Sequence, residues 1–186
     1  MAMTQQPLDR LLHDLDSALS EDAHGTRVAK LLESYAREAA DWRRFAFFEA
    51  TYYSRNLVRQ TDLFELIVLC WGPGQRSPIH DHAGQRCWMA VLDGEVRESM
   101  FRVAAGEHTG LATGPVRTVG RGQVAFVVDD LGWHRIESHN HAPAVTLHLY
   151  SRPIRECSVF DEDRGVITRK KLSYHSIGGV VQSLRV

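Results

Sequence analysis

The chain's 186 residues, 44% of them hydrophobic, suffice for one domain with a hydrophobic core, and we expect residues 1–186 to form it. The formal net charge of −1 gives no basic surface for nucleic acid, and residues 1–20 lack the continuous apolar stretch of a signal peptide or membrane anchor. We therefore expect a cytoplasmic protein with neither a nucleic-acid partner nor a membrane partner. We also expect a monomer, although nothing in the sequence specifies the oligomeric state.

The first quarter of the chain has the apolar spacing of α-helices. Leucines recur at residues 8, 11, 12, 15 and 19, and a second apolar stripe begins at Val28, after a break at Gly25. We expect helices within about residues 1–50, where they would cap the rest of the fold.

From about residue 52 the pattern changes to short runs rich in β-forming residues, separated by turns. The runs expected to form strands cover residues 64–71, 87–92, 95–101, 123–128, 134–138 and 145–150, with a further strand expected within 166–174. Asp93-Gly94, between two of these runs, predicts a hairpin turn. Many short strands with few helices between them predict a mainly β fold, a sandwich or small barrel over about residues 52–186.

The most informative feature is a pair of histidines one residue apart. His80 and His82 lie on an apparent strand, where alternate residues face the same side, so the pair could bind one metal ion. His134, which follows a turn at the start of a predicted strand, is the expected third ligand. His139 and His141 are the alternative, but their polar, proline-containing surroundings are typical of a solvated hairpin end.

A site of three neutral imidazoles leaves the full charge of a divalent ion uncompensated and therefore favours an anionic ligand such as a thiolate. An octahedral ion would keep three positions open, enough for a two-pronged substrate and dioxygen. Zinc also suits three histidines and a water molecule, and it would imply hydrolysis or hydration. The histidines alone leave both metals open.

Polar residues alternate with apolar ones in the predicted strand near residue 150. Thr146, His148 and Tyr150 share one face, so the histidine and the tyrosine could form a proton relay, or the three could fill a barrel as a hydrogen-bonded group. Arg55, which precedes the predicted strands, suits pairing with a carboxylate, although a surface salt bridge is the alternative.

The cysteines offer no scaffold of their own. Cys70, Cys87 and Cys157 make an odd number with no close spacing, which argues against a disulfide framework and against a Cys-x-x-Cys zinc site. Any special role of a cysteine must therefore come from its neighbours.

Taken in order, these motifs resemble the cysteine dioxygenase family, whose members are cupins. The spacing from Gly74 through His80 and His82 to Gly94 matches the first cupin motif, with Cys87 where most cupins carry a glutamate ligand. The segments that carry the resemblance are YSRNLV (53–58), CWG (70–72), SPIHDH (77–82), GWHR (132–135), LHLYS (147–151), Cys157 and YHS (174–176).

The resemblance implies a cupin barrel that holds ferrous iron, Fe(2+), through His80, His82 and His134. It implies oxidation of L-cysteine by dioxygen, O2, to cysteine sulfinate, with the substrate bound to iron through sulfur and nitrogen.

The resemblance also implies roles around the metal. Arg55 matches the arginine that pairs with the substrate carboxylate, and Tyr53, His148 and Tyr150 fall at carboxylate and relay positions. Cys87 matches the cysteine that forms a thioether with the tyrosine matching Tyr150, although bacterial members often have glycine there.

A second departure from the family pattern concerns the substrate. Arg152 stands where the animal enzymes have proline, and a similar arginine occurs in relatives that act on 3-mercaptopropionate. Arg152 could therefore bind substrate in a dioxygenase of another mercapto acid, such as 3-mercaptopropionate or mercaptosuccinate. Those relatives usually carry glutamine at the Arg55 position and lack Cys87, which favours L-cysteine. From a different class, the chain could be a metal-binding cupin that senses or stores a ligand without turnover.

Overall fold

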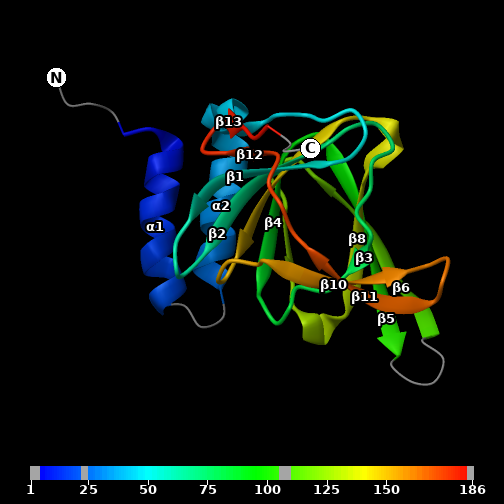
Figure 1. Cartoon of the computed structure of the whole chain (residues 1–186). Helices are drawn as coiled ribbons and strands as arrows, with labels where there is room; N and C mark the ends of the chain where they lie inside the picture. Colours follow the sequence, from blue (N-terminus) through cyan, green and yellow to red (C-terminus); the bar gives the residue numbers. More distant parts are fainter. Residues whose placement is uncertain (1–4, 22–24, 105–109, 184–186) are drawn as a thin grey trace.

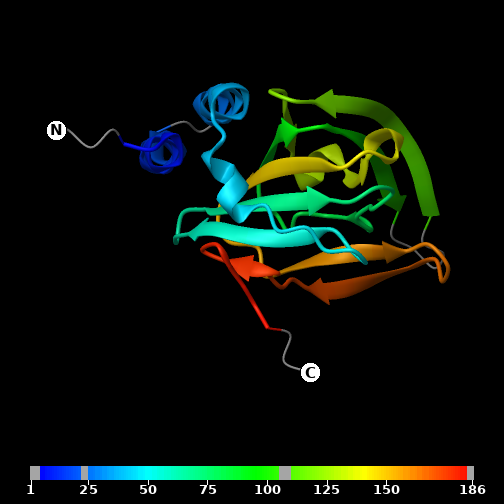
Figure 2. The same cartoon turned by 90° about the horizontal axis from the view of Figure 1, so that it is seen from above.

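The computed structural model describes residues 5–21, 25–104 and 110–183. Two helices lie to one side of two β-sheets, as seen in Figure 1 and, from above, in Figure 2. This mainly β architecture with N-terminal helices confirms the predicted fold class. The predicted domain limits, residues 1 and 186, lie outside the described residues, and the single domain stays a prediction.

The helices turn one apolar face toward the sheet. They are α1 (Pro7–Glu21) and α2 (Thr26–Glu38), followed by a short 3-10 helix, η1 (Asp41–Phe45). Asp41 joins the three elements, because its carboxylate accepts hydrogen bonds from the Leu8 amide and the Tyr35 hydroxyl, both at 2.9 Å. None of the helices within the described residues is long and apolar enough to cross a membrane.

The larger sheet has seven strands and lies next to the helices. Its strands are, in order across the sheet, β13 (Val180–Val181), β12 (Ser176–Ile177), β1 (Ser54–Gln60), β2 (Glu65–Trp71), β9 (Ala144–Tyr150), β4 (Cys87–Asp93) and β7 (Val124–Val127). Neighbouring strands are antiparallel, except that β1 and β12 are parallel.

The smaller sheet has six strands and faces the inner side of the first. Its strands are, in order, β11 (Val166–Lys171), β10 (Glu156–Asp161), β3 (Ile79–His80), β8 (Trp133–Ser138), β5 (Glu95–Ala104) and β6 (Gly110–Gly120). Two short 3-10 helices, η2 (Asp129–Leu131) and η3 (His139–His141), flank β8. The predicted hairpin at Asp93-Gly94 is wrong, because the strands on either side belong to different sheets. Gly94 (φ 68°) instead turns the chain from one sheet to the other, and a Cβ there would lie 2.5 Å from the Pro143 carbonyl oxygen.

Two apolar cores cover the two faces of the larger sheet. Strand β2 shows the division: Leu66 and Val68 pack with the helices, whereas Ile67 and Leu69 point between the sheets. Every residue of β2 is therefore buried, which explains its continuous apolar run. The inner side of this sheet is where the polar residues of the candidate site collect.

Candidate active site

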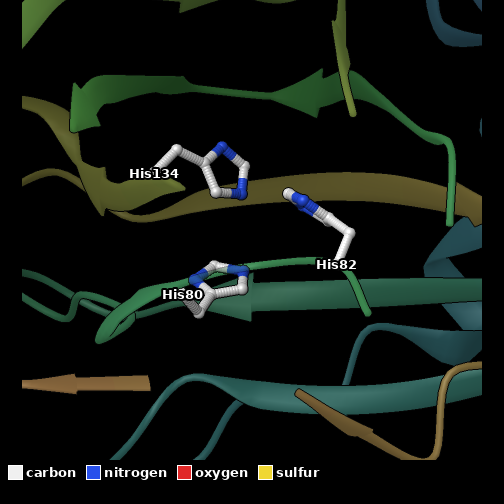
Figure 3. A group of neighbouring side chains, drawn as sticks. All are labelled: His80, His82 and His134. Carbon is white, nitrogen blue, oxygen red and sulfur yellow. The ribbon is translucent and has the colours of Figure 1, made fainter. Parts of the chain in front are cut away.

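Three histidines come together between the sheets. His80 ends β3, His134 lies opposite it on β8, and His82 follows two residues after His80. Their ligand atoms all lie within 4.8 Å of one another, and Figure 3 shows the three rings facing a common point. The centroid distances between rings are 4.6, 4.7 and 5.4 Å. The structure thus brings together the three residues predicted as metal ligands.

His82 reaches this point by a different route from the one predicted. Strand β3 ends at His80, so alternation along a strand does not place His82. Instead, the carboxylate of Asp129 accepts hydrogen bonds from the His82 amide (2.7 Å) and the Gly84 amide (2.6 Å). Asp129 therefore fixes the backbone that carries His82 from 47 residues away in sequence.

Each histidine turns its Nδ1 toward an oxygen acceptor. The distances are 3.0 Å from His80 to the Pro78 carbonyl and 2.8 Å from His134 to Glu98 Oε1. His82 Nδ1 lies 3.6 Å from Asp129 Oδ1, too far for a hydrogen bond. Metal-binding imidazoles are typically oriented by such outer acceptors, which leave Nε2 for the metal.

Glu98 is a buried carboxylate that sequence reasoning missed. One oxygen faces His134 and the other accepts a hydrogen bond from Arg117 Nε at 2.5 Å, so its charge is paired. Glu98 lies on β5 two residues after buried Val96, on the same inward face. That alternation was the available signal, because a carboxylate among inward residues needs a partner.

The electrostatics of the site suit metal binding. Burial, followed by repulsion from neighbouring histidines, lowers the pKa of His80 and His134 well below the ordinary value. Both therefore stay neutral, which is the form of imidazole that binds a metal. The donor set fits a divalent transition-metal ion held by three nitrogens.

The competing pair lies outside this cluster. His141 is exposed and His139 is half-buried, within η3. The turn is solvated as expected, but it connects β8 to β9 in the other sheet and is not a hairpin end.

Arg55 lines a cavity of about 660 Å³ together with Tyr53, Lys170, Tyr174 and His175. Its side chain is only 11% exposed, and its Nη2 lies 3.4 Å from Glu65 Oε1. The Nε is buried with no hydrogen-bond partner among the described residues. A buried guanidinium donor without a partner suits a carboxylate ligand.

Tyr53 and Tyr150 are both neighbours of Arg55. The Tyr53 ring stacks on Trp71 at 4.6 Å, which fixes its orientation at the cavity wall. The Tyr150 phenol interacts electrostatically with Arg55, and its ring centroid lies 6.2 Å from that of His82. Neither the three clustered histidines nor Tyr150 lines the cavity itself. Tyr150 links Arg55 to the histidine cluster because it is a neighbour of both Arg55 and His82.

Cys87, Tyr150 and Glu65 form one row across the larger sheet. Tyr150 on β9 is paired with Cys87 on β4 and with Glu65 on β2. Burial raises the pKa of Cys87 and of Tyr150, so both stay protonated at neutral pH. The structure therefore places Cys87 beside Tyr150, as the resemblance implied.

His148 belongs to a buried hydrogen-bond chain. Its Nε2 lies 2.9 Å from Thr146 Oγ1, which also accepts a hydrogen bond from Trp71 Nε1 at 2.8 Å. Its Nδ1 lies 3.9 Å from Cys87 Sγ. Within the described part of the chain, no hydrogen bond joins His148 directly to Tyr150, whose ring centroid is 6.3 Å away.

Arg152 is not brought together with Arg55. It is exposed, has a φ of 97°, and lines a separate cavity with Gly84, Gln85 and Arg86.

A mainly β fold of two facing sheets, with three histidines between them that could hold a metal ion, defines the chain as a cupin. The family model described as cysteine dioxygenase type I matches residues 1–163. Cysteine dioxygenase type 1 of Rattus norvegicus is 35% identical over 179 residues, which cover 95% of this chain and 88% of that protein. The Homo sapiens protein of the same name is 34% identical over the same shares. The chain belongs to the cysteine dioxygenase type I family.

Among solved structures, an RmlC-like cupin protein from Desulfovibrio desulfuricans matches with a TM-score of 0.43 and 19% identity. That match covers 59% of this chain and 91% of the other.

Proposed function

We propose that the protein is an iron-dependent thiol dioxygenase that oxidises L-cysteine with dioxygen to cysteine sulfinate. The observation that carries this proposal is a cluster of three inward-facing histidines near a buried arginine that has an unpaired donor. Tyr150 is a neighbour of both the cluster and the arginine. Membership of the cysteine dioxygenase type I family supports the same reaction.

His80, His82 and His134 would hold the ferrous ion. Bound there, ferrous iron would supply the redox chemistry that lets dioxygen react with a thiolate. The Pro78 carbonyl would orient the His80 ring, whose Nδ1 lies 3.0 Å away, and Glu98 would orient the His134 ring, whose Nδ1 lies 2.8 Å away. Three neutral ligands favour an anionic substrate sulfur.

Arg55 would bind the substrate carboxylate through its free Nε and the adjacent Nη group. Tyr53, stacked on Trp71, would bound the same end of the pocket. A carboxylate at Arg55 and a sulfur at the histidines would orient a small mercapto acid past Tyr150.

Tyr150 would donate a hydrogen bond into the reaction site, because burial and the neighbouring Cys87 thiol raise its pKa and keep the phenol protonated. His148 would fix the local hydrogen-bond network through Thr146, and burial lowers its pKa so that it remains neutral. Cys87, paired with Tyr150 across the sheet, would form a thioether with the phenol ring during turnover. The thiol S–H and one ring C–H bond would break, and dioxygen would accept the two electrons and two protons.

The test is oxygen uptake by protein loaded with ferrous iron, against L-cysteine, 3-mercaptopropionate and mercaptosuccinate, with the product identified by mass spectrometry. We expect L-cysteine to give cysteine sulfinate and one O2 to be consumed for each thiol oxidised. A protein that binds iron and L-cysteine but consumes no oxygen would instead be a non-catalytic cupin. Zinc-loaded protein is the control, because zinc has no redox chemistry.

We also propose that residues 1–186 act as a single-domain, cytoplasmic monomer. The apolar core shared by α1, α2 and the larger sheet supports one cooperative unit. Sedimentation of the purified protein would test the monomer.

A further inference from the structure

Glu65 is a carboxylate behind the cavity wall, next to Arg55, that the proposed reaction does not use. It is fully buried, at 0% exposed, and begins β2 beside Tyr150 of β9. Its Oε2 accepts a hydrogen bond from the Ile154 amide at 3.0 Å, and its Oε1 faces Arg55 at 3.4 Å. A buried carboxylate needs such partners, so its position is fixed from two directions.

Several groups hold Arg55 and Glu65 in place. The Arg55 guanidinium lies 5.9 Å from the centroid of the Tyr174 ring and interacts electrostatically with the Tyr150 phenol. Burial raises the pKa of Glu65, whereas Arg55, the Ile154 amide and Tyr174 act in the opposite direction. The Arg55 guanidinium at 3.4 Å and the Ile154 amide at 3.0 Å both stabilise the ionised carboxylate. The pair then places one negative charge next to the cation that the substrate carboxylate would use.

We propose that Glu65 is a specificity-determining residue that limits this pocket to thiols with a single carboxylate. The inference rests on the proposed function. The proposed complex contains a divalent ion at the histidines, a substrate thiolate and one substrate carboxylate. Together with the positive charge of Arg55 and the negative charge of Glu65, these charges sum to zero. Glu98 adds no net charge, because it is paired with Arg117. A second carboxylate would be buried without a counter-charge.

The other cations near the pocket do not supply that counter-charge. Lys170 and Lys171 line the same cavity but are exposed on β11, where solvent and salt screen their charges. Arg155, which also acts on Glu65, is exposed. Arg152, the residue expected to favour a dicarboxylate, lines a different cavity.

The decisive variant is Glu65→Gln, which keeps the shape and an acceptor for the Ile154 amide but removes the charge. We compare kcat/KM for mercaptosuccinate with kcat/KM for 3-mercaptopropionate, and we expect this ratio to rise on the order of tenfold in the variant. A change of this size is expected when a nearby unit charge is removed at an effective dielectric constant of about 20. Glu65→Asp keeps the charge and should keep the low ratio. Glu156→Gln is the matched control, because that carboxylate is exposed and is paired with Arg169 at the surface. An unchanged ratio in folded Glu65→Gln protein would overturn the proposal.

Calorimetric titration without oxygen provides a readout independent of turnover. Iron-loaded wild-type protein should bind 3-mercaptopropionate at least about tenfold more tightly than mercaptosuccinate, and Glu65→Gln should narrow that difference. Tighter binding of mercaptosuccinate by the wild-type protein would contradict the proposal even if the variant did not fold. If no thiol supports oxygen uptake, the proposed reaction fails, while these titrations still decide the role of Glu65.

Discussion

The two faces of the seven-stranded sheet bury side chains of different chemistry. On β9, Val145, Leu147 and Leu149 pack with the helices, and the residues between them point inward. The helix side is held by apolar contact, whereas the inner side carries Thr146, His148 and Tyr150 in a network of hydrogen bonds and paired charges. The difference shows that one face stabilises the fold, whereas the buried polar groups of the other face form the candidate site.

The largest expected effect concerns the metal cluster, which reaches into the polar face from the opposite sheet. His134→Ala removes one of three ligands, so we expect loss of iron retention and of oxygen uptake. Metal analysis by mass spectrometry together with an oxygen electrode checks both. His141→Ala is the control, because His141 is exposed and outside the cluster. Full activity of His134→Ala would show that another histidine is the third ligand.

A substitution on the helix side should have the opposite signature. Leu147→Ala creates a cavity in the core between sheet and helices, and we expect it to lower the free energy of unfolding by about 2–5 kcal/mol. The KM for L-cysteine of the protein that remains folded should stay unchanged. Denaturant unfolding and steady-state kinetics below the unfolding transition measure the two effects. Val166→Ala, at an exposed position, should change neither; a large rise in KM for Leu147→Ala would mean that the two faces are coupled.

Arg55 tests the carboxylate end of the polar face. Charge-assisted hydrogen bonds contribute roughly 1.5 to 3 kcal/mol each, so Arg55→Ala should lower kcat/KM for L-cysteine by at least about tenfold. Arg55→Lys should not restore it, because lysine lacks the two-pronged geometry. Arg59→Ala, exposed on the same strand, is the matched control.

Two outcomes would move this assignment. If cysteamine, which has no carboxylate, competes evenly with L-cysteine, Arg55 does not select the substrate. If Arg152→Ala reduces activity more than Arg55→Ala, the carboxylate binds at Arg152 instead.

The sequence predicted the apolar face better than the polar one. Strands β2, β4 and β9 agree with the predicted runs within about one residue, because continuous burial on both faces leaves a strong apolar signal. Strand β6 was missed because it is an exposed edge strand that contains Gly114 and Pro115. Strands β1 and β10 were also missed, since exposed residues interrupt their apolar pattern.

The histidine cluster could be predicted from motif spacing, but the roles of two carboxylates in the site, Asp129 and Glu65, could not. Asp129 holds the His82 backbone through contacts that only the folded chain creates. Glu65 begins an apolar strand, where its charge gives no hint that Arg55 will lie against it. Such partners depend on register between strands, which no local pattern specifies.

The smallest expected effect concerns Cys87. The test distinguishes an inert, buried Cys87 thiol from one that couples to Tyr150 on the polar face. Cys87 is paired with Tyr150 across β4 and β9, and its thiol is protonated because burial raises its pKa. A thiol beside a phenol and an oxygen-activating centre is open to oxidative coupling, and a bond from sulfur to the ring would fix Tyr150 in its hydrogen-bonding position.

Protein turned over with iron, L-cysteine and air should therefore contain a fraction lighter by two hydrogens, with both residues in one cross-linked peptide. Cys87→Ser should prevent the mass loss and reduce activity only modestly, and Cys157→Ser, which leaves the pair intact, should do neither. An unchanged mass after many turnovers, with Cys87 still open to alkylation after denaturation, would mean that this thiol only fills space and that Tyr150 is held by Arg55 and the surrounding packing alone.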